Sequence, residues 1–255
     1  MPMLEKLMAK ELPSPNYRRL FYPGVSVLLL ILMFLGFRQF YLYGKAYPGR
    51  ELAPPIRTLL ILHGIGMTSW MVLFVAQPLL ILAGNRRVHR LLGRIGAGLA
   101  AVMVVLSFRL GIESTLLSPP DLRIWGLASK QFLAVPIISI LIFSGFVILG
   151  VSKRRQPEVH RSMMLLATLA VMSAAVSRID FLNSLYQGTI WEAVFGPFFT
   201  TLAIGALFLA VKWLPTRSLN PWLVWGYGGL VLSDALIMQL ATTGVWDLFA
   251  TFLLQ

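Results

Sequence analysis

The sequence contains no cysteine, and only 13% of its 255 residues are charged. Without cysteine the chain can form no disulfide, no Cys-ligated zinc site, no Cys-bound iron–sulfur cluster and no thiol nucleophile. A globular domain is about 25% charged, whereas this chain is 57% hydrophobic with a mean hydropathy of +0.77. These values exclude a soluble domain, a disordered chain and a fibrous protein.

Several catalytic motifs are also missing. The sequence has no Gly-rich phosphate loop followed by Lys-Ser/Thr, no H-E-x-x-H and no G-x-S-x-G. ATP-driven transport by this chain alone is therefore not expected. The last apolar stretch has no lysine, which argues against a retinal Schiff base of the rhodopsin type. Whether the protein is an enzyme stays open.

A membrane-spanning helix needs about 20 mostly apolar residues, and seven stretches of the chain qualify. They are residues 20–43, 57–83, 91–112, 131–151, 162–182, 193–214 and 222–246. The sequence therefore predicts an all-α polytopic membrane protein with seven transmembrane helices, in which helices 2–5 form a central four-helix bundle. Residues 1–19 are expected to be a cytoplasmic interfacial lead-in, and residues 20–255 a single membrane domain.

The net charge of +12 indicates cationic loops against an anionic leaflet rather than nucleic-acid binding, because the chain is so apolar. Most of the 22 basic residues fall on one side of the seven-span topology. This side collects Lys6, Lys10, Arg18, Arg19, Arg86, Arg87, Arg90, Arg94, Lys153, Arg154, Arg155, Arg161, Lys212 and Arg217. The positive-inside rule then predicts an N-terminus in the cytoplasm and a C-terminus in the periplasm of a bacterial inner membrane.

Two of the three histidines, His89 and His160, occupy equivalent positions at the starts of the third and fifth apolar stretches. Each is followed directly by an arginine, Arg90 or Arg161, which suggests a faint parallel repeat; chance similarity between apolar helices is the alternative. If the two helix starts are neighbours, the imidazoles could hold haem iron or a metal, and the arginines could bind haem propionates. Alternatively, both histidines are interfacial residues that contact lipid phosphate.

The third histidine, His63, lies within the second stretch. It shares one helix face with Met67, Trp70, Phe74 and Gln77, because these residues are spaced by three and four. A face with His, Trp and Gln is expected to point into the bundle rather than at lipid. His63 could be a metal or haem ligand or a proton carrier; alternatively, it makes an interhelical hydrogen bond.

Further charges lie within or at the ends of the spans. Arg109 and Glu113 have the spacing of an ion pair on one helix, and Asp234 lies deep in the last stretch. A lone carboxylate there would be costly, so Asp234 should be protonated or paired with Arg178, Arg109 or His63. The predicted polar cluster on the outer side comprises His63, Arg109, Glu113, Arg178, Asp180 and Asp234. The alternative is a set of separate salt bridges that only pack helices.

Three strings carry a resemblance to a known family: Leu62-His63-Gly64 with Trp70 and Gln77, then His89-Arg90-Leu91-Leu92-Gly93, then His160-Arg161-Ser162-Met163-Met164-Leu165-Leu166-Ala167-Thr168. The chain resembles a family of uncharacterised bacterial multi-spanning inner-membrane proteins, over about residues 57–246. In that family an LHG…W…Q helix precedes HRRLG-like and HKRLMLLAT-like helices. The sequence departs from the pattern at Ser162-Met163, where Arg-Leu is more common, and at Asp234, where the pattern is more basic. The resemblance implies a membrane location and no activity, apart from a weaker likeness to proteins that accompany respiratory oxidases.

The sequence thus favours a redox-associated membrane protein in which His63, or the pair His89 and His160, holds haem b or a metal. A second hypothesis is a non-enzymatic accessory subunit of a larger membrane complex that binds partner helices, lipid or pigment. A third is a small-solute or proton carrier that uses His63 and Asp234.

Overall fold

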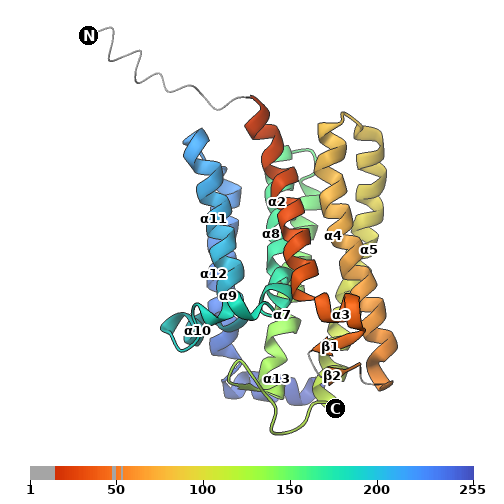
Figure 1. Ribbon diagram of the computed structural model, residues 1–255, viewed down its shortest axis with the longest axis vertical. Coiled ribbons are helices and arrows are strands. Elements are labelled where there is room, and N and C mark those ends of the chain that lie inside the picture. The colour runs from red at the N-terminus through yellow and green to blue at the C-terminus, as the bar shows by residue number, and fades with distance from the viewer. Residues whose placement is uncertain (1–14, 48–49, 53) are drawn as a thin grey trace, which may run out of the picture.

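The computed structural model describes residues 15–47, 50–52 and 54–255. In this part of the chain seven helices are long and apolar enough to cross a membrane. They are built on α2 (Pro15–Gly36), α4 (Arg57–Leu82), α5 (Arg86–Leu116), α7 (Ala134–Ser152), α8 (Pro157–Val176), α11 (Phe199–Thr216) and α12 (Pro221–Leu240). They run alternately up and down in one bundle (Figure 1). The predicted all-α, seven-span fold of an integral membrane protein is confirmed.

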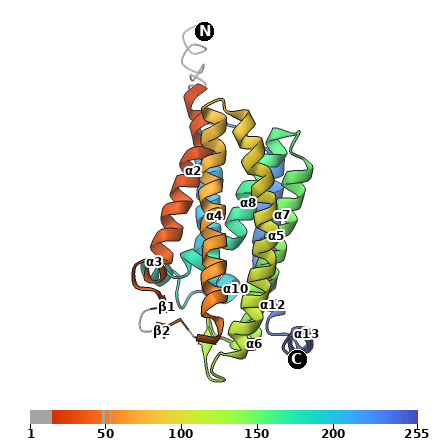
Figure 2. The ribbon, with the colours of Figure 1, turned by 90° about the vertical axis from the view of Figure 1, so that its right-hand side faces the viewer.

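The α4–α5, α7–α8 and α11–α12 turns lie together at one end of the bundle, where α2 also begins (Figures 1 and 2). We name this the basic end, because the three turns and the helix starts beside them carry Arg86, Arg87, Lys153, Arg154, Arg155 and Arg217. The chain ends at the opposite end. The first described helix therefore begins on one side of the bundle and the C-terminus lies on the other, as an odd number of spans requires.

The opposite end is covered by short elements. The helices are α3 (Arg38–Tyr43), α6 (Ser129–Phe132), α9 (Asp180–Ser184), α10 (Ile190–Phe195) and α13 (Gly244–Leu253), with 3-10 turns at Pro54–Ile56 (η1) and Gly196–Phe198 (η2). Two small antiparallel hairpins pair β1 (Lys45–Tyr47) with β2 (Arg50–Glu51), and β3 (Arg123–Ile124) with β4 (Leu127–Ala128). In Figure 1, α13 lies across the end of the bundle rather than along it.

Several span boundaries differ from the expected ones. Helices α2, α8 and α12 end at Gly36, Val176 and Leu240, before the predicted limits of 43, 182 and 246, and α11 starts six residues later than expected. In each case the apolar sequence continues into a short separate helix. Hydropathy could not separate the two, because exposed apolar side chains such as Phe181 and Leu248 continue through the break. At the start of the chain, α2 begins at Pro15, inside the predicted lead-in; residues 1–14 lie outside the described residues.

Helix α8 is the centre of the bundle. It is 72% buried over its span, whereas α4 is only 17% buried. Helices α2, α7, α11 and α12 all pack against it. The approach of α2 is close enough that a side chain at Gly36 would collide with the backbone carbonyl of Ala175. Small residues of this kind allow transmembrane helices to come into direct contact.

The four predicted central helices do contact one another in sequence: α4 packs on α5, α5 on α7, and α7 on α8. The ring is closed by a side-chain contact between α4 and α8, where the Trp70 indole donates a hydrogen bond of 3.2 Å to the Thr168 hydroxyl. The remaining spans α2, α11 and α12 lie outside this ring and pack against the other sides of α8.

Candidate functional site

The structure brings two histidines together at the basic end. His89 lies in the first turn of α5 and His160 in the first turn of α8, and their ring centroids are 6.4 Å apart with the planes at 88°. Both helix starts are fixed locally. The Asn85 side chain caps α5 by accepting a hydrogen bond from the Val88 amide at 3.1 Å, and Pro157 occupies the first position of α8. We name His89 and His160 the histidine pair.

His160 is oriented by the neighbouring helix. Its Nδ1 lies 2.9 Å from the carbonyl oxygen of Gly150, near the end of α7. A side chain at Gly150 would collide with Met164, so the glycine lets α7 and α8 approach closely enough for this contact. Because a carbonyl only accepts, Nδ1 carries a proton, and in the neutral imidazole Nε2 then has the lone pair. This is the tautomer in which an imidazole binds a metal through Nε2.

His89 is oriented by Gln77 of α4. With the Gln77 amide turned so that both its atoms are satisfied, its nitrogen donates to Nδ1 and to the backbone carbonyl of His89, and its oxygen accepts from the Gly93 amide at 3.0 Å. The opposite rotation of the amide would place its oxygen against Nδ1, where a protonated Nδ1 could donate to it. Gln77 therefore controls which nitrogen of His89 is free to act as a ligand.

The two arginines that follow the histidines have different roles. Arg161 is ion-paired with Glu158 of its own helix, and its guanidinium lies 5.4 Å from the centroid of the Tyr22 ring. Glu158 also accepts a hydrogen bond of 2.9 Å from Asn220. Arg90 is exposed and makes no hydrogen bond or ion pair within the described ranges. Of the two predicted propionate partners, Arg90 alone has a side chain without such a bond.

Within residues 15–47, 50–52 and 54–255, no three His, Asp or Glu side chains are grouped so that they could hold a metal ion. A metal at the histidine pair would therefore take two protein ligands and complete its coordination from a porphyrin, water or another molecule. Both imidazoles are half-buried, so the pair is accessible to such a ligand.

His63 lies apart from the pair. It is 14 residues before Gln77 on α4, which is about 20 Å along a helix. Its Nδ1 is 3.3 Å from the hydroxyl of Ser107 on α5, and Arg178 lies within electrostatic range. This is the interhelical hydrogen bond that was the structural alternative for His63. It gives no support to His63 as a metal ligand.

The helix face that carries His63 points into the bundle, as predicted. Trp70 is buried and packs edge-on against Phe143 of α7, with ring centroids 4.9 Å apart. Met67 and Phe74 lie against the hydrophobic core. This face of α4 therefore packs against the interior of the four-helix ring.

The predicted polar cluster at the opposite end is divided into separate parts. Arg109 and Glu113 form an ion pair of 2.6 Å along α5, with the Arg109 side chain 65% exposed. Arg178 lies 4.7 Å from the centroid of the Phe37 ring, and Arg178 and Asp180 help to line a cavity of about 100 Å³.

Asp234 is isolated from both of these parts. It is buried at 4% exposure in α12. No hydrogen bond or ion pair connects it to another residue in the part of the chain that the structure describes. The pairings expected with Arg178, Arg109 or His63 are not formed there, because α12 packs on α7 and α8 rather than on α5.

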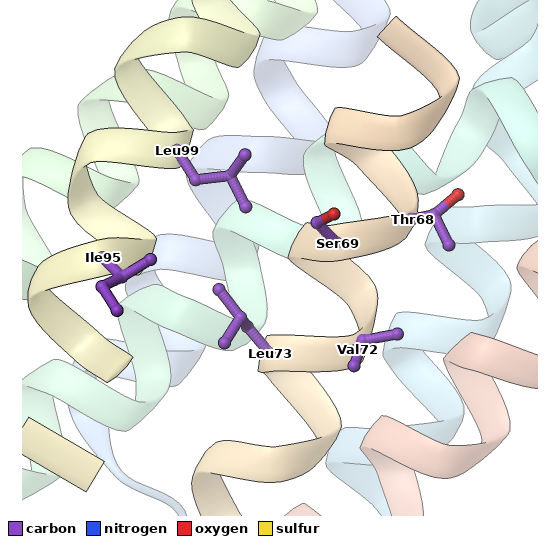
Figure 3. A pocket seen from close by; sticks show the side chains of 6 residues that line it. All are labelled: Thr68, Ser69, Val72, Leu73, Ile95 and Leu99. Carbon is purple, nitrogen blue, oxygen red and sulfur yellow. The ribbon is translucent and has the colours of Figure 1, made fainter. Parts of the chain in front are cut away.

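A groove of about 460 Å³ opens on the outer face between α4 and α5 (Figure 3). Its walls are Val72 and Leu73 of α4 and Ile95 and Leu99 of α5, with the hydroxyl residues Thr68 and Ser69 beside them. The Thr68 hydroxyl is hydrogen-bonded to the Tyr41 hydroxyl at 2.7 Å. The groove is apolar and lies in the middle of both spans. None of the predicted site residues lines it.

Sequence reasoning missed the residues that support the basic end. Gly150, Asn220, Tyr22 and Lys212 carry no motif, and they lie on four different helices or turns. The sequence marked only Lys212, as one of the basic residues of this side, and linked none of the four to the others, because each is important only through its position beside α8.

Comparison of the chain with family models, with curated proteins and with solved structures finds no match.

Proposed function

We propose that this integral membrane protein holds a redox-active metal, either as haem b or as a bound ion, between His89 and His160. The observation that carries the proposal is the separation of 6.4 Å between the two ring centroids. Two imidazoles that bind one metal atom from opposite sides, each at about 2.0 Å, have centroids about 6 Å apart. The centroid separation of the pair matches this spacing.

The surroundings of the pair support the same proposal. Histidines that bind metals usually donate their other ring nitrogen to a carbonyl or carboxylate, which fixes the ring and raises its basicity. His160 makes such a bond to Gly150, whereas the Gln77 amide nitrogen donates to Nδ1 of His89, so binding of a metal through Nε2 of His89 requires the Gln77 amide to rotate. Exposed Arg90, next to His89, is available to bind a propionate if the metal is haem iron.

The position of the site follows from charge. The positive-inside rule assigns the basic end to the cytoplasm, in a bacterial inner membrane if the family resemblance holds. The metal would then lie at the cytoplasmic membrane surface, where it could exchange electrons with a soluble or membrane-bound partner.

The test is spectroscopy and metal analysis of the protein purified in detergent from cells supplied with haem precursor and trace metals. We expect either a Soret band that shifts on reduction or about one equivalent of a transition metal. His89→Ala and His160→Ala should each remove it, and His63→Ala, the matched control, should keep it. A protein with neither haem nor metal, or a signal that His63→Ala removes and His160→Ala keeps, overturns the proposal.

The second candidate is an accessory subunit that binds another membrane protein. It is favoured by α4, the least buried span, whose outer face carries the groove beside Val72. A photo-crosslinking residue at Val72 should then capture one defined partner band in native membranes, whereas the same residue at Leu232, exposed on α12, should not. Equal labelling by lipid alone at both positions would contradict this function.

A further inference from the structure

Two cationic side chains from different helices converge on one aromatic ring at the basic end. The Arg161 guanidinium of α8 lies 5.4 Å from the centroid of Tyr22, and Nζ of Lys212 on α11 lies 5.0 Å from the same centroid. Lys212 also donates a hydrogen bond of 3.1 Å to the Tyr22 hydroxyl. Three helices that are distant in the sequence thus build one cationic site around Tyr22.

One acidic residue contacts this site on the side of α8. Glu158 pairs with Arg161, and it also accepts a hydrogen bond from Asn220. The Nε atom of Arg161 is buried and has no hydrogen-bond acceptor within the described residues. A buried donor without an acceptor is costly. The site therefore offers two cationic side chains and an unused buried donor to a bound anion.

The depth of the site indicates which anion it meets. Arg161 is in the first turns of α8, Lys212 is in the last turns of α11, and Tyr22 is near the start of the α2 span. All three positions are at the level where a membrane presents its headgroups. The Arg161 side chain is 41% exposed, so the site opens outward. Guanidinium and ammonium groups are the usual protein ligands of phosphate, and aromatic rings favour the same depth.

We propose that Tyr22, Arg161 and Lys212 form a binding site for the phosphodiester headgroup of an anionic phospholipid. A zwitterionic lipid brings its own cation to the same place and is bound more weakly. The bound phosphate bridges α8 and α11 over Tyr22 and so fastens α2 and α11 to the central helix. The site is distinct from the histidine pair and does not depend on a metal.

The test uses the full-length protein, purified and delipidated in a neutral detergent, with thermal unfolding as the readout. Dioleoyl phosphatidylglycerol should raise the unfolding temperature saturably, by several degrees more than dioleoyl phosphatidylcholine at equal concentration. Arg161→Gln and Lys212→Gln should each lose at least half of this difference. Arg86→Gln and Arg87→Gln remove the same charge from the same end without touching Tyr22, and they should keep it.

Further measurements distinguish a lipid site from a folding defect, from general attraction to charged lipid and from binding of a soluble phosphate. Lys212→Arg retains the cation and should keep the lipid-dependent rise, which shows that the loss in Lys212→Gln is not a folding defect. Equal loss in the Arg86→Gln and Arg87→Gln controls would mean general attraction to charged lipid and would overturn the site. An equal stabilisation by soluble glycerol phosphate would assign the site to a soluble phosphate and would also overturn the lipid proposal.

Discussion

The indole of Trp70 on α4 donates a hydrogen bond of 3.2 Å to the hydroxyl of Thr168 on α8. Both residues are buried, and Thr168 in turn donates to the carbonyl of Met164 at 3.0 Å. This contact joins the least buried span to the most buried one. It closes the ring of four helices that holds the histidine pair at one end and His63 further along.

Replacing Trp70 by Phe keeps an aromatic ring beside Phe143 but removes the donor to Thr168. We expect a coupling energy between Trp70 and Thr168 of about 0.6 kcal/mol, and at most about 1.7, as double-mutant cycles give for other hydrogen bonds between membrane helices. Unfolding in mixed micelles measures it. Trp225→Phe is the control, because Trp225 is 80% exposed. A non-additive effect in the Trp70→Phe, Thr168→Val double mutant would assign the loss to this bond; full additivity would speak against it.

Replacing Gln77 changes the ligand strength of His89 in a defined direction. Gln77→Glu places a carboxylate that can only accept from Nδ1–H, which leaves Nε2 free, so metal should bind more tightly than in the native protein, where the Gln77 amide donates to Nδ1. Gln77→Leu removes this donor but supplies no acceptor, so its metal affinity should be about 10- to 100-fold below that of Gln77→Glu. Metal titration of the purified protein measures both. Glu and Leu variants with equal affinity would show that Gln77 has no influence on the site.

Asp234→Asn tests whether the buried carboxyl group is unpaired. The amide has nearly the same shape and carries no charge, so with no ion pair to lose we expect a change in unfolding free energy well below that of a broken buried pair. Breaking a buried pair would instead cost about 3–5 kcal/mol. Denaturant titration in mixed micelles separates the two. A large loss would reveal a cationic partner for Asp234.

Gly36→Ala tests the close approach of α2 to α8. The added methyl group meets the carbonyl of Ala175, so the helices must separate at a cost of about 1–3 kcal/mol. Gly24→Ala is the matched control on the same helix, because nothing lies within 4 Å of the new methyl group. The control should be neutral or up to about 1 kcal/mol more stable. Equal effects of the two variants would mean that α2 does not pack as described.

The candidate site was predictable only in part. The sequence singled out His89 and His160 by their matching positions, but their contact depends on α5 and α8 both packing against α7. The grouping of His63, Arg178 and Asp234 was expected from similar depth in the membrane. Depth is the same for every side of a bundle, so it could not show that α12 carries Asp234 away from α5.

The sequence by itself determined the number of spans and their alternating direction, because the energetic cost of placing polar backbone or charge in lipid depends on the length and composition of each apolar run. The tertiary structure alone decided that α8 is the central helix and that α2, α8 and α12 stop short of their apolar runs. It also brought Tyr22, Arg161 and Lys212 together. Lipid and protein interior are equally apolar, so hydropathy does not distinguish a helix that faces one from a helix that faces the other. That choice is made by close packing between particular small and large side chains, such as Gly36 against Ala175.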